Sequence, residues 1–101
     1  MTLFAAGAPA AAATSAPKPP ADAYAARLLR AVDTCEARAP QGTPLPRILS
    51  CVRDLAAPEP GNAHQDDIWR LVLDCLWFGW SPESGFDDDA VNACLGAGGI
   101  W

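Results

Sequence analysis

The chain has 101 residues, half of them apolar, and a formal net charge of −5. This length allows one domain at most. An acidic chain without a basic stripe cannot neutralise phosphates, which argues against a nucleic-acid partner and against docking on an anionic membrane surface.

Residues 1–21 are rich in alanine and proline, and Lys18 is their only charged side chain. No basic segment precedes Leu3 and Phe4, as a secretory signal would require, and this favours an intracellular location. The prolines at 17–20 favour an extended polyproline II segment. We expect a disordered N-terminal tail; the alternatives are an arm that lies along a partner and a cleaved leader.

Residues 22–96 are predicted to form an all-α domain, a small four-helix bundle. Asp22 can cap a first helix that stops before Pro40. Thr43, which is followed by a proline, is the expected N-cap of a second helix that ends before Pro58. The first helix gathers large apolar residues on one face at helical spacing, which indicates a buried side.

The second half of the chain predicts two more helices. Asn62 is the expected N-cap of the third, with Gln65 as its capping-box partner. The acidic run 87–89 opens the fourth, because acidic side chains favour the positive end of a helix dipole. Gly96 is predicted to close it, leaving 97–101 as a flexible tail. No strand alternation or hairpin dipeptide competes with these helices.

The third helix is apolar around most of its circumference. From Ile68 to Trp80 it is too short to cross a bilayer, which takes about 20 residues, so no membrane span is expected. Arg70 and Asp74 lie on one side of a helical wheel, and the apolar residues cover about 260° of it, whereas a surface helix shows a stripe little more than 100° wide. We therefore expect two apolar faces.

One of these faces is aliphatic and suits a core, whereas the other is rich in tryptophan. Clustered tryptophans are typical of interface anchors. We predict that the second face binds another protein, together with the apolar tip of the tail. The predicted partner-binding residues are Trp69, Leu73, Trp77, Trp80 and Trp101. The alternative is that these tryptophans cover the edge of their own bundle.

The four cysteines fall one on each predicted helix, with none of the close pairs typical of a structural zinc site. They can be buried free thiols, disulfides or, least in keeping with the spacing, a zinc cluster. In a simple hairpin Cys35 and Cys51 are offset by about 6 Å along the helix axes, and Cys75 and Cys94 by about 4 Å. We therefore expect Cys75–Cys94 as the candidate disulfide. An even cysteine count suits an oxidising compartment.

Catalytic signatures are missing from the sequence. The single histidine, His64, falls in the first turn of a predicted helix, and no serine has a nucleophile-elbow context. We expect no enzyme activity, no cofactor and no metal site.

Two functions fit the sequence. The first is a non-catalytic helical subunit or adaptor of a protein assembly. The second is a small acidic inhibitor or immunity-type protein that blocks a basic site. The acidic residues available to such an inhibitor are Asp66, Asp67, Asp74, Asp87, Asp88 and Asp89. Steep loss of affinity with rising ionic strength would indicate the inhibitor.

Overall fold

The computed structural model describes residues 20–101, and nearly all of the expected N-terminal arm lies outside them. The described part is mostly helical, as predicted, with one short hairpin. In chain order, the elements are α2 (Ala23–Arg38), α3 (Leu45–Ala56), α4 (Ala63–Phe78), β2 (Trp80–Ser81), β3 (Gly85–Phe86) and α5 (Asp88–Ala97). None of the helices in this part is both long and apolar enough to cross a membrane.

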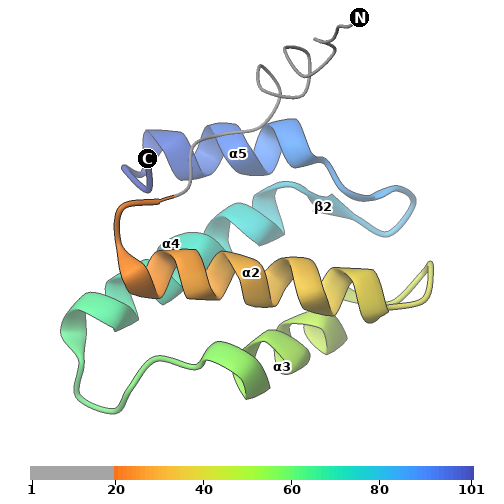
Figure 1. Ribbon diagram of the computed structural model, residues 1–101. Helices are drawn as coiled ribbons and strands as arrows, with labels where there is room; N and C mark the ends of the chain where they lie inside the picture. Colours follow the sequence, from red (N-terminus) through yellow and green to blue (C-terminus); the bar gives the residue numbers. More distant parts are fainter. Residues whose placement is uncertain (1–19) are drawn as a thin grey trace, which may run out of the picture.

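The helices are arranged as two antiparallel pairs around one core (Figure 1). α2 pairs with α3, α4 pairs with α5, and α2 also packs on α4. All four helices contribute buried apolar side chains to this core. The buried Tyr24 hydroxyl donates a hydrogen bond to the carbonyl oxygen of Ala56 over 2.7 Å, which joins the start of α2 to the end of α3.

Two of the predicted helix caps are confirmed, and the predicted acidic run supplies a third. The carboxylate of Asp22 accepts a hydrogen bond from a backbone N–H in the first turn of α2, and Asn62 does the same for α4. Asp87 caps α5 in this way. Each cap pairs a donor that has no partner within its own helix. Asp22 also contacts the ring of His64, which joins the starts of α2 and α4.

Two other cap predictions are wrong. α3 begins at Leu45, with Pro44 at the N-cap, because the Thr43 hydroxyl donates to the carbonyl of Pro40 over 2.6 Å instead of capping the helix. The side chain of Gln65 accepts a hydrogen bond from the backbone N–H of Glu59, so it closes the preceding loop and not a capping box. In both cases a local turn competes successfully for the polar group.

The C-terminal end of α5 also differs from prediction. Gly96 lies inside the helix, and Gly99 closes it with a φ of 87°, a left-handed conformation that glycine adopts without steric cost. The backbone N–H of Ile100 donates to the carbonyl of Leu95 over 3.1 Å, and the Ile100 side chain packs against the core. The last residues are therefore tied to the helix and do not form a free tail.

Both pairs of cysteines form disulfides, Cys35–Cys51 between α2 and α3 and Cys75–Cys94 between α4 and α5. The free-thiol and zinc alternatives are therefore wrong. The offset that disfavoured Cys35–Cys51 was calculated for two parallel helix axes in a simple hairpin, and it does not prevent the bridge in this structure. The Cα atoms of this pair lie 5.8 Å apart, within the usual range.

The hairpin between α4 and α5 was not predicted. Trp80 pairs with Phe86 and Ser81 with Gly85 in an antiparallel register, so three residues form the loop. Gly85 has a φ of 72°, as a three-residue hairpin of this kind requires. Gly79 lets the base of the hairpin approach α5, since a Cβ atom there would clash with the side chain of Val91.

Candidate functional site

The predicted tryptophan face does not form one exposed surface. Trp69 is only 7% exposed and belongs to the core, with the guanidinium of Arg53 4.8 Å from the centre of its ring. Residues four apart on an α-helix drift by about 40° around its axis. The stripe that begins with Trp69 has therefore turned away from the core by Trp77, two such steps later. Trp69 cannot contact a partner in this structure.

Two adjacent aromatic residues at the end of α4 are exposed. Trp77 is 51% exposed and Phe78 is 73% exposed, and we call these two residues the aromatic patch. The helix beneath them is held by the Cys75–Cys94 disulfide. Because that scaffold is fixed, little conformational entropy would be lost when a partner covers the patch.

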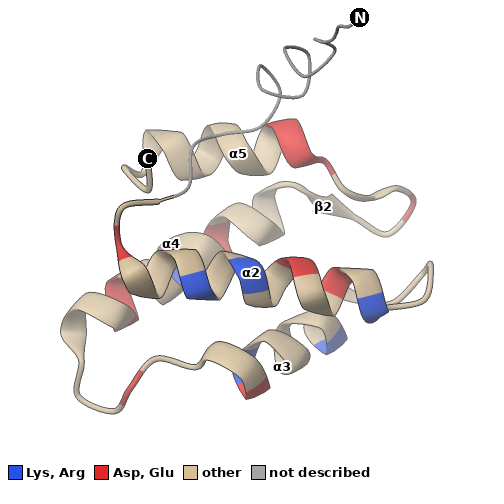
Figure 2. Ribbon diagram, viewed as in Figure 1, with Lys and Arg blue, Asp and Glu red and all other residues tan. Residues whose placement is uncertain are grey.

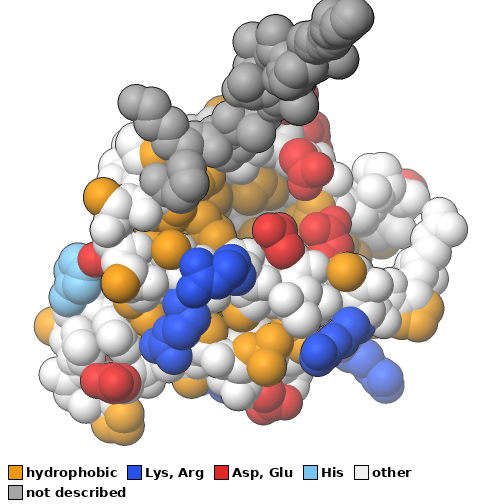
Figure 3. All heavy atoms as spheres, in the orientation of Figure 1, with side chains coloured by type: hydrophobic (Ala, Val, Ile, Leu, Met, Phe, Trp, Pro, Cys, Tyr) orange, Lys and Arg blue, Asp and Glu red, His pale blue; other side chains and the backbone are white. Residues whose placement is uncertain are grey.

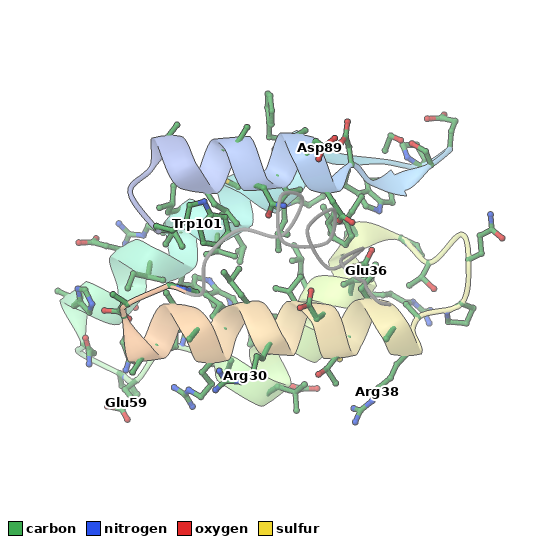
Figure 4. The ribbon with its side chains drawn as sticks, turned by 45° about the horizontal axis from the view of Figure 1, so that its top comes forward. Arg30, Glu36, Arg38, Glu59, Asp89 and Trp101 are labelled. Atoms are coloured by element: carbon green, nitrogen blue, oxygen red, sulfur yellow. A yellow bond between two sulfur atoms is a disulfide. The ribbon has the colours of Figure 1, made fainter. Side chains whose placement is uncertain are left out.

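The structure separates the remaining predicted partner-binding residues. Leu73 is half-buried and packs against the core. Trp80 lies beyond the end of α4, in strand β2, so the helical wheel does not apply to it. Trp101 is 36% exposed and lies at the opposite end of α5 from the hairpin, beside Gly96 (Figure 4). Leu73 and Trp77 are one helical turn apart in α4, whereas Trp80 belongs to the hairpin and Trp101 to the end of the chain.

The hairpin that follows the aromatic patch in sequence lines a half-open cavity of about 450 Å³. Its walls are the last turn of α2, the α2–α3 connection and the β2–β3 hairpin, and among residues 20–101 its charged lining residues are Glu36 and Glu83 alone. We call it the acidic cavity. Trp80 and Phe86 both line it, because residues directly opposite each other in a hairpin share one face. It has the size of a small-ligand site.

Local hydrogen bonds hold the walls of the acidic cavity. The hydroxyls of Ser81 and Ser84 lie 2.7 Å apart, and the backbone N–H of Ser84 donates to the Ser81 hydroxyl over 3.2 Å. The backbone N–H of Asp87 donates to the carbonyl of Gly79 over 2.7 Å and closes the base of the hairpin. These bonds shape the hairpin before any ligand is present.

Acidic side chains gather near this cavity, over α2 and the start of α5 (Figure 3). Partial burial, followed by repulsion from Asp88 and Asp33, raises the pKa of the Glu36 carboxyl above its ordinary value. Partial burial, followed by repulsion from Asp88, likewise raises the pKa of Asp33. Among residues 20–101, no lysine or arginine forms an ion pair with any of the three carboxylates.

A second cavity of about 450 Å³ lies on the other side of the α2–α3 connection. It is lined by the Cys35–Cys51 disulfide, and the charged residues that the described part of the chain contributes to it are Arg38 and Arg47. In the last turn of α2, the Glu36 side chain lies on the side that faces α5, whereas Arg38 leaves the helix on the opposite side (Figure 4). The connection therefore divides an acidic surface from a basic one.

The described residues do not bring together a catalytic or metal-binding group. Within 20–101 there is no cluster of three metal-ligating side chains. The paired hydroxyls of Ser81 and Ser84 are in the hairpin, whereas His64 contacts Asp22 near the start of α4. The arrangement thus offers surfaces for binding, and the expected absence of enzyme activity stays a prediction.

Comparison of the chain with protein-family models, with curated proteins and with solved structures found no match. Any assignment of function therefore takes its support from the aromatic patch and the cavities.

Proposed function

We propose that this chain is a non-catalytic protein-binding subunit or adaptor, a small four-helix bundle that docks on another protein through the aromatic patch. The observation that carries this proposal is the exposure of Trp77 and Phe78 at consecutive positions of the last turn of α4. Large aromatic side chains supply much of the binding energy at protein interfaces, and adjacent exposed ones are uncommon on a surface that contacts only water.

The position of the patch supports the proposal. Leu55, on α3, is the other strongly exposed apolar residue of the helices, at 46%, and no second large apolar side chain is exposed beside it along the chain. The patch, in contrast, places two exposed aromatic side chains in the last turn of α4. Two large aromatic residues are stronger candidates for interface anchors than an isolated leucine.

The acidic-inhibitor alternative has less support. The acidic residues on which it rests do not share a surface: Asp66 and Asp67 lie in the first turns of α4, whereas 87–89 begin α5. Because α4 and α5 run antiparallel, these two groups lie at opposite ends of the molecule (Figure 2). These two groups therefore do not form one acidic surface, and this weakens the support for an inhibitor.

The proposal is tested by quantitative capture. The immobilised full chain and a Trp77→Ser/Phe78→Ser variant are incubated with an extract of the cells that make the protein, and bound proteins are quantified by mass spectrometry. We expect at least one protein whose retention falls about 30-fold with the variant, since an aromatic hot spot contributes about 2 kcal/mol or more.

Leu55→Ser is the matched control, because it removes an exposed apolar residue outside the patch. It should retain the same protein as the unaltered chain does. If the captured proteins are the same for the unaltered chain and the double variant, the patch is not the docking surface and the proposal fails.

A further inference from the structure

We propose that the acidic cavity receives a cationic side chain, a lysine or an arginine, from the protein partner. This inference rests on the proposed function and adds to it the chemistry of the partner's contact. It names an occupant for a cavity that begins two residues beyond the aromatic patch along the chain.

The charge of the cavity favours a cation. Of the residues that the structure describes, Glu36 and Glu83 are the only charged ones in the lining, and Asp33 and Asp88 lie close enough to Glu36 to repel it. The charges around the cavity would repel an anion. A cation would offset the repulsion among the carboxylates, which no described basic side chain does.

The two aromatic residues of the hairpin, Trp80 and Phe86, favour the same class of ligand. Trp80 and Phe86 both line the cavity, and a cation held over an aromatic face is attracted by the ring's quadrupole. Tryptophan is the best of the aromatic residues for this contact. The rings also offer an apolar surface for the methylene groups of a lysine or arginine.

The geometry leaves the cavity open to a partner. Figure 4 shows Glu36 on the side of α2 that faces α5, whereas Arg30 and Arg38 leave α2 on the opposite side. The protein's own described arginines therefore do not compete for this carboxylate. The volume of about 450 Å³ accommodates a long side chain together with part of the backbone that bears it.

The test uses a single blocked amino acid and needs no partner. The ¹⁵N-labelled full chain is titrated with N-acetyl-lysine methylamide, and the Trp80 indole N–H and the backbone N–H groups of Ser84 and Gly85 are followed by NMR. We expect saturable shifts at these groups, with an affinity on the order of millimolar for so small a probe. The neutral probe, acetylated on its side-chain nitrogen, should leave them unshifted.

Two variants locate the interaction. Glu36→Gln should weaken binding of the lysine probe about fivefold, as expected for removal of one partly exposed charge partner. Glu59→Gln is the matched control, because Glu59 is an exposed glutamate on the α3–α4 connection, away from the cavity (Figure 4). It should bind the probe as the unaltered chain does. Phe86→Leu should also weaken binding, since it keeps an apolar residue but removes the ring.

Several results would overturn the inference. Equal shifts with the charged and neutral probes, or unchanged affinity in Glu36→Gln, would show that charge does not select the ligand. The chain's own Lys18 is the competing occupant. If Lys18→Gln moves the Trp80 indole resonance without any probe and raises the probe's affinity, the cavity serves an internal lysine and not a partner.

The outcomes also separate this inference from the proposed function. If probe binding depends on Glu36 but partner capture does not change when Trp77 and Phe78 are replaced, the cation site is retained and the patch is rejected. The reverse pair of results would retain the patch and reject the cation site.

Discussion

The Tyr24 hydroxyl is the clearest single-residue contact between two helices. It donates to the carbonyl oxygen of Ala56 in a buried position. Tyr24→Phe would leave this carbonyl, at the end of α3, without its donor and in a dry environment. We expect the free energy of unfolding to fall by about 1–2 kcal/mol, measured by urea denaturation. An unchanged midpoint would mean that water reaches this carbonyl and replaces the hydroxyl.

The carboxylates near the acidic cavity give a prediction about pH. Burial, and then repulsion from Asp88, holds the pKa of Glu36 above its ordinary value, so the ionised form opposes folding above that pKa. This penalty is relieved as pH falls and the group protonates. Asp88→Asn should lower the Glu36 pKa toward its ordinary value without reaching it, because partial burial still raises it. The measurement is ¹³C NMR titration of the side-chain carboxyl.

Asp67→Asn is the control for this titration. It removes a negative charge at the start of α4, far from α2's last turn, and should leave the Glu36 pKa unchanged. If Asp88→Asn has no more effect than Asp67→Asn, the carboxylates do not repel one another and the electrostatic basis of the acidic cavity is wrong.

Sequence reasoning worked at the residue scale where a single local bond decides the outcome. Asp22, Asn62 and Asp87 each precede a helix and accept from an N–H three residues later. It did not work for Thr43 and Gln65, because a turn and a helix cap compete for the same polar group over a few tenths of a kcal/mol. Which of them wins depends on the path of the connection, and the path is set by tertiary packing.

At the scale of elements, one disulfide joins the two helices of each antiparallel pair. The two bridges close loops with sequence separations of 16 and 19 residues. Removing a bridge of this loop length costs about 3 kcal/mol in the chain-entropy account. Cys75→Ala/Cys94→Ala should therefore lower the free energy of unfolding by about 2–4 kcal/mol in chemical denaturation. If the free energy of unfolding changes by less than about 1 kcal/mol, packing alone holds α4 against α5 and the bridge adds little stability.

The helices themselves were predictable, since apolar spacing and terminal prolines mark their limits, whereas the hairpin was not. Its signal was present: two aromatic residues flank a Ser-Pro-Glu-Ser-Gly segment, which has turn residues and a glycine at the required place. Strands of two residues are too short to show alternation. The Cys35–Cys51 pairing was missed for a related reason, because the shape of a six-residue connection is not fixed by its length.

At the scale of the whole molecule, the two sides of α4 should respond differently to mutation. Val72 is fully buried, and Val72→Ser would open a cavity and bury a hydroxyl, at a cost of about 2–4 kcal/mol in unfolding free energy. Trp77→Ser should cost less than about 1 kcal/mol, since half of that side chain is already in water. Thermal denaturation of both variants makes the comparison. Equal destabilisation would place Trp77 in the core.

The sequence predicted an apolar surplus on α4 but not its distribution. Trp69 and Trp77 share a stripe on the helical wheel, yet the first is buried and the second exposed, because the stripe drifts by about 80° around the helix axis between the two residues. The acidic cavity could not be predicted at all. It joins residues from α2 and from a hairpin more than 40 positions later in the chain, and only tertiary structure brings them together.

The docking role of the aromatic patch is tested most directly by the affinity of the captured partner, once purified, for three forms of the chain. Isothermal titration calorimetry would compare the unaltered protein with Trp77→Ser and Leu55→Ser. We predict that Trp77→Ser raises the dissociation constant about 30-fold and that Leu55→Ser changes it less than about twofold. A dissociation constant that Trp77→Ser leaves unchanged, or that both variants raise equally, would contradict the assignment of this surface.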